Sequence, residues 1–355
     1  MSSKHAVPDV LDGVNLLRGV AAIAVAIFHA TPLTGGQWVP GGYLAVDFFF
    51  LLSGFVLSHA YDSRLAGGMT ARGFVVVRLI RFLPLYLAGL AIGLALEGVL
   101  ILVDSPNAIE PGKLIVVAAL GIVFLPYLVV GKDMFPLNVP SWSLHHEFVV
   151  NTAWAIFHKQ LKGALLMSVA VASLVVVVVG VLDFGSAAFG SEAQHYVYAL
   201  GRALFSFIVG VLIFREGIRP IVGMRVSALV FSAALLVPVP KDVRWAFDLV
   251  CVVVVFPMLL PGIAQARFTG RRIRSASRWL GDMSYGLYAI HYPLIWLTSG
   301  LVGRAGLESV RMFVGVALVA SLVFVCGHIE RKLDSPLRRR ARKFTDRWFT
   351  SGARA

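Results

Sequence analysis

The sequence predicts an all-α, polytopic integral membrane protein of about ten transmembrane helices plus one broken or re-entrant helix. Of its 355 residues, 58% are hydrophobic types and 14% are charged, and the mean hydropathy is +0.81. Soluble domains are nearer to about half apolar and about a quarter charged. This composition excludes a cytosolic enzyme and a disordered chain. The two cysteines, Cys251 and Cys326, both lie in apolar runs, which excludes a disulfide scaffold and a thiolate metal site.

Apolar runs of membrane-crossing length recur along the chain, and such a helix needs about 20 mostly apolar residues. The ten candidate runs are 13–31, 43–61, 82–103, 114–130, 163–182, 197–214, 225–239, 245–263, 283–301 and 309–328. An eleventh segment, 140–158, opens with a polar string and becomes apolar only at Phe148. The first run has no small-residue cleavage site and more spans follow it, so we expect a retained helix rather than a signal peptide.

Basic residues gather in the short loops between these runs. Lys and Arg number 32 against 19 Asp and Glu, a formal net charge of +13. The clusters are Arg64/Arg72/Arg78/Arg81, Arg215/Arg219/Arg225, Arg267/Arg271/Arg272/Arg274/Arg278 and Arg338/Arg339/Arg340/Arg342/Lys343. This is the positive-inside pattern of a membrane protein rather than a nucleic-acid-binding surface, and it predicts that both termini are cytoplasmic.

The same loop charges predict which segment does not cross. An even number of spans must separate the first two basic clusters, yet five apolar runs lie between them. We therefore expect 140–158 to be broken or re-entrant, and polar backbone at membrane depth is tolerated where it lines a protein-enclosed cavity. The sequence shows no internal repeat, so we expect one transmembrane domain, 1–333, and a short basic cytoplasmic tail, 334–355.

The first helix carries two ionisable residues at membrane depth, Arg18 and His29. Eleven residues at about 100° and 1.5 Å each bring them onto one face, separated by about 16 Å. Ionisable groups inside a bilayer are functional candidates. The alternative is an arginine that snorkels to one interface and a histidine at the other.

The second run adds a carboxylate and a surface of small residues, and the third run adds a pair of guanidinium groups. Asp47 needs a partner or water at its depth. Ser53 and Gly54 allow close approach of another helix or a ligand, and plain helix packing is the favoured explanation. Arg78 and Arg81 are neighbours on a helix and form a fork for a phosphate-bearing ligand. The alternative for this pair is binding of lipid headgroups.

The segment 140–158 holds one acid, Glu147, after His145 and His146. A carboxylate beside an imidazole can orient it as a base. A zinc site is not expected, because adjacent histidines on a helix point about 100° apart. Further along, Tyr288 lies on a tyrosine stripe typical of packing or of an interfacial belt, and His291 precedes the helix-kinking Pro293.

Five stretches, taken together and in order, resemble the motifs of the acyltransferase family 3 membrane proteins, from about residue 11 to 336. They are Arg18 to His29; Asp47-Phe48-Phe49-Phe50 with Ser53-Gly54-Phe55; Arg78-x-x-Arg81 with Pro84; Trp142-Ser143-Leu144 with Glu147; and Ser284-Tyr285-Gly286-Leu287-Tyr288 with His291 and Pro293. Two elements depart from the pattern: Glu330 and Pro336 are more widely spaced than the closing Glu-Pro element, and Asp12-Gly13 is displaced from Arg18.

The resemblance implies an O-acyltransferase of the polysaccharide O-acetyltransferase type, in its stand-alone form without a fused esterase-like domain. It implies about ten helices in the plasma (bacterial inner) membrane, a cytoplasmic acyl-CoA donor, with acetyl-CoA expected, and a glycan or lipid-linked sugar acceptor at the outer face. No permanently bound cofactor and no metal are expected.

Acyl transfer to a hydroxyl needs a base, groups that bind the donor, and a group that stabilises the oxyanion. We expect His29 to be the base and Glu147 to orient it, with both groups catalytic. Arg18, Arg78 and Arg81 are expected to bind CoA phosphates at the cytoplasmic mouth of one continuous passage that reaches His29. The expected substrate-binding residues are Asp47, Ser53, Trp142, Tyr288 and His291. The alternative function is a transporter or flippase of a polar lipid-linked substrate, although its expected second broken helix is missing.

Overall fold

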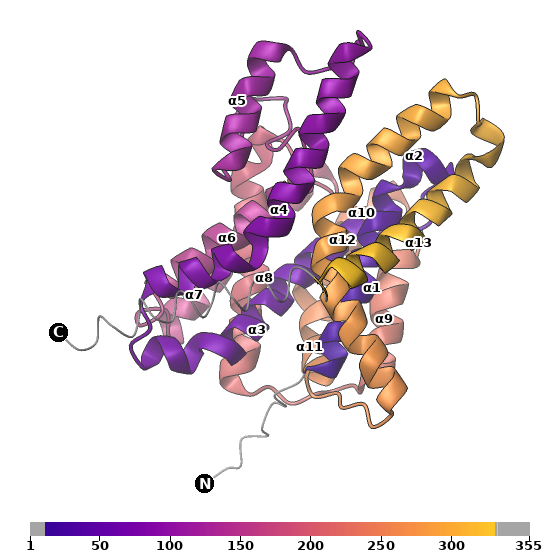
Figure 1. The fold of residues 1–355 in the computed structure, drawn as a ribbon. Coiled ribbons are helices and arrows are strands. Elements are labelled where there is room, and N and C mark those ends of the chain that lie inside the picture. Colours follow the sequence, from indigo (N-terminus) through magenta and orange to yellow (C-terminus); the bar gives the residue numbers. More distant parts are fainter. Residues whose placement is uncertain (1–10, 331, 333–355) are drawn as a thin grey trace.

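The computed structural model describes residues 11–330 and 332, and within them every regular element is a helix (Figure 1). The α-helices are α1 Asp12–His29, α2 Thr31–Thr34, α3 Ala45–Ala66, α4 Ala71–Leu102, α5 Pro111–Ile122, α6 Ser141–Ile156, α7 Gly163–Phe184, α8 Tyr196–Glu216, α9 Met224–Leu236, α10 Lys241–Val250, α11 Phe256–Ala264, α12 Arg271–Arg304 and α13 Arg311–Ile329. Four short helical segments complete them: η1 Gly42–Leu44, η2 Ala193–His195, the π-helical η3 Cys251–Val255 and η4 Glu308–Val310.

The all-α, polytopic membrane architecture is confirmed. Each of the ten apolar runs overlaps a helix, and in the described part of the chain seven helical stretches are long and apolar enough to cross a membrane. Helices α5 and α9 are apolar but shorter. Large apolar side chains such as Ile115, Val175 and Phe313 are exposed on the outside of the bundle, as expected for surfaces that face lipid. The predicted tail, 334–355, lies outside the described residues.

Two helices begin well before their apolar runs. Helix α4 starts at Ala71 rather than near residue 82, after Thr70 caps it by accepting a hydrogen bond from the Gly73 amide at 3.1 Å. Helix α12 starts at Arg271 rather than near residue 283. Hydropathy marks only the apolar part of a helix, and arginine is itself a good helix former. The early start places Arg78 and Arg81 inside α4, more than a turn from its end.

The segment 140–158 differs in one detail from the expectation. Helix α6 runs from Ser141 to Ile156 without a break, and its 16 residues fall short of the length of a full span. Its first half is buried: Trp142, His145 and His146 are all enclosed by protein. The polar string is therefore compatible with an ordinary helix because neighbouring helices shield it from lipid.

Close helix packing positions the two sides of the site. Helix α1 lies along α12, and α3 lies along α8 (Figure 1). A Cβ atom at Gly54 would overlap the carbonyl oxygen of Phe207, and one at Gly210 would overlap the carbonyl oxygen of Leu51. Small residues at such crossings let two backbones touch. The packing interpretation of Gly54 is thus supported.

Candidate active site

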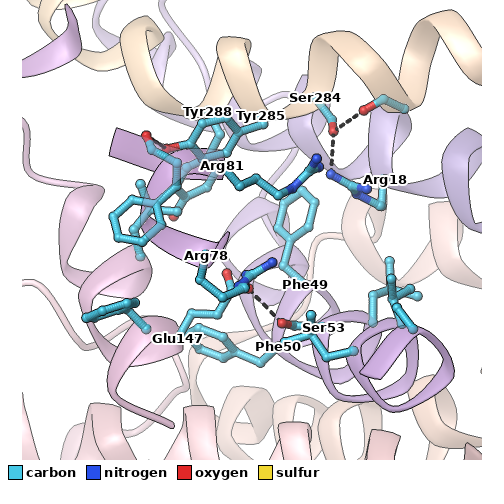
Figure 2. Close-up of a pocket in the computed structure, with 18 of the residues that line it drawn as sticks. Arg18, Phe49, Phe50, Ser53, Arg78, Arg81, Glu147, Ser284, Tyr285 and Tyr288 are labelled. Carbon is cyan, nitrogen blue, oxygen red and sulfur yellow. Dashed lines mark hydrogen bonds and ion pairs between the residues drawn. The ribbon is translucent and has the colours of Figure 1, made fainter. Parts of the chain in front are cut away.

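Helices α1, α3, α4, α6 and α12 enclose a cavity of about 530 Å³. Of the sequence-predicted site residues, six line it: Arg18, Ser53, Arg78, Arg81, Glu147 and Tyr288. They come from segments up to 270 residues apart (288 − 18). The motif residues therefore converge on one cavity (Figure 2).

Glu147 anchors one wall of the cavity through its Oε1 atom. This oxygen accepts hydrogen bonds from Ser53 Oγ at 2.6 Å, Arg78 Nη2 at 3.0 Å and Asn151 Nδ2 at 3.4 Å. The side chains of Arg78 and Glu147 are 15% and 21% exposed, so their ion pair is largely desolvated. Glu147 thus fixes the position of Arg78. It makes no hydrogen bond to His29, so the expected orienting contact between these two residues is not present.

Two further guanidinium groups enter the cavity from opposite walls, Arg18 from α1 and Arg81 from α4 (Figure 2). Arg18 Nη2 donates to Ser284 Oγ at 3.3 Å, and Ser284 Oγ donates to the Gly281 carbonyl at 2.7 Å. Arg81 has no hydrogen-bond or ion-pair partner within the described part of the chain. The cavity lining holds four arginines against three carboxylates, Glu147, Asp282 and Glu330, and this excess of positive charge favours an anionic ligand.

Aromatic and hydroxyl groups close the cavity next to His291. The Tyr288 hydroxyl lies 2.5 Å from Ser143 Oγ, and its ring packs edge-on against Phe49 at 5.8 Å between centroids. The Tyr288 ring is also 5.8 Å from that of His291. Tyr288 therefore separates the arginine-lined cavity from the histidines.

His29 and His291 form a pair on the other side of Tyr288. His29 Nδ1 lies 2.9 Å from His291 Nε2. Both Arg18 and His29 contact α12, as expected from their shared helix face, but neither histidine lines the cavity. Helix periodicity thus predicted the shared face, but the cavity lining does not include the histidine pair, and Tyr288 is the lining residue whose ring lies 5.8 Å from that of His291.

Two other sequence-predicted residues, Asp47 and Trp142, lie outside the cavity lining. Asp47 forms a bidentate ion pair with Arg202, at 3.0 Å from Nε and 2.5 Å from Nη2, and both side chains are 1% exposed. The Arg202 guanidinium also stacks over the Trp142 ring at 5.5 Å, and it donates to the Phe189 carbonyl. These contacts make Asp47 and Trp142 part of the structural support around α8.

The sequence reasoning missed Ser143, Ser284 and Arg202. The two serines lie inside the recognised motifs, adjacent to Trp142 and Tyr285, so the motif boundaries were available signals. Arg202 is a lone arginine in an apolar run, and an intramembrane arginine is a candidate partner for Asp47.

Comparisons with known proteins agree with this geometry. A family model described as an acyltransferase domain matches residues 11–329. The chain belongs to acyltransferase family 3. It is 36% identical over 185 residues to "Protein 2 in picA locus" of Rhizobium radiobacter, covering 49% of this chain and 94% of that protein. It is 27% identical over 307 residues to acyltransferase MdmB of Streptomyces mycarofaciens, covering 79% and 73%.

Shorter matches point to the same class. A putative O-acetyltransferase of Staphylococcus aureus is 33% identical over 78 residues, which cover 21% of this chain and 12% of that protein. No solved structure matches the chain. As a member of acyltransferase family 3, the protein is a membrane acyltransferase.

Proposed function

We propose that the protein is a membrane-bound O-acyltransferase that moves an acyl group, expected to be acetyl, from cytoplasmic acyl-CoA to a hydroxyl of a cell-surface glycan or lipid-linked sugar. Its location would be the plasma (bacterial inner) membrane. One observation carries the proposal: Arg18 and Arg81, for which the described residues provide no ion pair with a carboxylate, face a cavity, and its lining residue Tyr288 packs against His291 of the His29–His291 pair. Arg18, a candidate contact for an anionic donor, and His29, a candidate base, thus lie on the same helix, α1.

The arginines would hold the phosphates of the donor. Guanidinium groups bind phosphate oxygens through charge-assisted and often bidentate hydrogen bonds. Arg18 and Arg81 would make the main contacts, and Arg78, held by Glu147 at 3.0 Å, would present its remaining N–H groups. The thioester end of the donor would then extend toward Tyr288.

His29 would act as the general base. It takes the proton from the acceptor hydroxyl as the oxygen attacks the thioester carbonyl carbon. The carbon–sulfur bond then breaks, and the CoA thiolate receives a proton from the imidazolium. Tyr288 lies between the cavity and the histidines. For the thioester to reach His29, the Tyr288 side chain would have to move, or the thioester would have to pass beside it. The hydroxyl of Tyr288 is then placed to donate to the carbonyl oxygen as negative charge develops.

The names of the relatives support the acyl-transfer chemistry at different levels. The Staphylococcus aureus relative is named as a putative O-acetyltransferase, which supports an acetyl donor and an oxygen acceptor. The Streptomyces relative is named only as an acyltransferase, which supports the broader class.

Mass spectrometry of cell-envelope glycans tests the function. Strains with the gene, without it, and with His29→Ala would be compared, with the abundance of the membrane protein checked by immunoblot. We expect the glycan to lose the mass of one acyl group without the gene, and His29→Ala to restore the protein but not the modification. Full modification by His29→Ala would contradict the base assignment.

A purified-protein assay addresses the transporter alternative. The protein would be incubated with acetyl-CoA and an envelope glycan extract, and free CoA would be measured. Release of CoA that depends on the extract supports the enzyme, whereas a transporter releases none.

A further inference from the structure

The contact between His29 and His291 has a defined direction. His29 Nδ1 lies 2.9 Å from His291 Nε2, and the His291 side chain is fully buried. An N–H···N hydrogen bond between two neutral imidazoles requires one nitrogen to carry a hydrogen and the other to offer a lone pair. The remaining contacts of His291 decide which ring donates.

Backbone carbonyls hold the other nitrogen of His291. Its Nδ1 atom lies 2.9 Å from the Leu287 oxygen and 2.9 Å from the Tyr288 oxygen. A carbonyl oxygen only accepts hydrogen bonds, so His291 Nδ1 carries the hydrogen. In the neutral ring, Nε2 of His291 is then the lone-pair nitrogen, and it faces His29.

The acceptor role of His291 Nε2 also fixes which nitrogen of His29 carries the hydrogen. Because His291 Nε2 accepts, His29 Nδ1 must be the donor, and the lone pair of neutral His29 resides on Nε2. A base whose second nitrogen donates to a fixed acceptor is held in one tautomer and one ring orientation. His291 is therefore suited to do for His29 what a carboxylate does for the histidine of a hydrolase, but with a neutral acceptor.

We propose that His291 is a positioning residue of the acyl transfer, which holds His29 as the Nδ1–H tautomer so that Nε2 receives the proton of the acceptor hydroxyl. The inference rests on the proposed function, with His29 as base. The hydroxyl O–H bond breaks as oxygen bonds to the acyl carbon, and the proton moves to His29 Nε2. When the C–S bond breaks, that proton passes to the CoA sulfur, and His291 stays neutral throughout. The His291 side chain is fully buried whereas that of His29 is partly exposed, so direct contact with the substrate is disfavoured for His291.

Two amide substitutions separate positioning from packing. In His291→Gln, the side-chain amide can place an oxygen near the former Nε2 and accept from His29. In His291→Asn, the shorter amide reaches only the position of Nδ1, so it can bond the Leu287 and Tyr288 carbonyls but offers His29 no acceptor. Both variants are small, neutral and polar, and thus form a matched pair. His291→Leu removes both functions.

The purified variants would be assayed with acetyl-CoA and the envelope glycan extract. We expect His291→Gln to retain kcat within about tenfold of wild type, and His291→Asn and His291→Leu to lose about 100-fold or more, with the KM for acetyl-CoA unchanged within about twofold. Equal activity of the Gln and Asn variants, or wild-type kcat in the Leu variant, would overturn the positioning role.

A readout independent of activity keeps this inference separate from the function on which it rests. Nitrogen NMR of the ¹⁵N-histidine-labelled full chain distinguishes protonated from unprotonated ring nitrogens, and His29→Gln identifies the His29 signals among the nine histidines. We expect a protonated Nδ1 in wild type and in His291→Gln. A protonated Nε2 on His29 in the wild type would overturn the inference even if CoA is released. The expected tautomer without any CoA release would instead refute the proposed acyl transfer.

Discussion

Arg81 lines the cavity, and the described residues provide it with no hydrogen-bond or ion-pair partner. If it binds a phosphate of the donor, Arg81→Ala removes a charge-assisted hydrogen bond of about 1.5–3 kcal/mol. We expect the KM for acetyl-CoA to rise about tenfold or more, with a smaller decrease in kcat at saturating donor. Steady-state kinetics of the purified protein measure both.

Arg72 offers a matched control for this variant. It is on the same helix but exposed and outside the cavity, so Arg72→Ala should leave the KM nearly unchanged. Arg81→Lys should give an intermediate KM, because lysine keeps the charge but loses the planar fork. A large decrease in kcat with an unchanged KM in Arg81→Ala would argue against phosphate binding.

The Asp47–Arg202 pair predicts a stability effect rather than a kinetic one. Asp47→Asn leaves the buried Arg202 guanidinium without its counter-charge, and breaking such a pair typically destabilises by about 3–5 kcal/mol. We expect a clearly lower thermal unfolding midpoint in detergent. The exposed Glu110–Lys113 pair is the control, since Glu110→Gln should leave the midpoint unchanged. Wild-type stability with lost activity in Asp47→Asn would restore the substrate-binding role.

Local spacing was enough to predict some of these features and not others. The shared face of Arg18 and His29 follows from helix geometry within one element. The partner of His29 does not, because residue 291 is brought close only by the packing of α1 along α12. The same reason explains why Glu147 was expected beside His29: both are ionisable at membrane depth, but only the tertiary structure assigns Glu147 to Arg78 and Ser53.

At the scale of helices, the crossing of α3 and α8 depends on two glycines. Gly54→Ala would drive its Cβ into the Phe207 carbonyl and force the helices apart. Overpacking of this kind costs about 1–3 kcal/mol. We expect a lower unfolding midpoint, together with weaker activity because Ser53, the neighbour of Gly54, holds Glu147.

Gly98→Ala is the control variant for Gly54→Ala. No atom lies within 4 Å of the Cβ position at Gly98, and alanine favours the helix more than glycine does. Its midpoint should equal or exceed that of the wild type. Equal midpoints for the two alanine variants would show that α3 and α8 do not require contact at Gly54.

Helix positions were predictable to the extent that they are apolar. Each of the ten runs overlaps a helix, and seven helical stretches within the described residues have the length and apolar composition of a span, because lipid requires long apolar stretches with internally bonded backbone. The starts of α4 and α12 were not predictable from hydropathy, since arginines interrupt the sequence at the beginning of both helices: Arg72, Arg78 and Arg81 in α4, and Arg271, Arg272 and Arg274 in α12. The continuity of α6 depends on burial by its neighbours, which no local pattern encodes.

For the whole molecule, the proposed mechanism requires the arginine-lined cavity to open toward the side where acyl-CoA is made. The loops at one end of α8 and those at the other differ in charge. Arg215, Arg219 and Arg225 lie near its C-terminal end, whereas Asp183 and Glu192 precede its start. The 21 residues of α8 separate these ends by about 32 Å, a bilayer thickness. Positive-inside bias then predicts that residues 217–223 are cytoplasmic.

Single cysteines at the two ends of α8 test this orientation. The native Cys251 and Cys326 are buried, so the unmodified protein should give little background labelling. Ala188 and Ile218 are exposed in the loops before and after α8. We expect an impermeant maleimide to label Ala188→Cys in intact spheroplasts, and Ile218→Cys only after the membrane is opened. The reverse pattern would place the arginine cavity on the outer side and remove its access to cytoplasmic acyl-CoA.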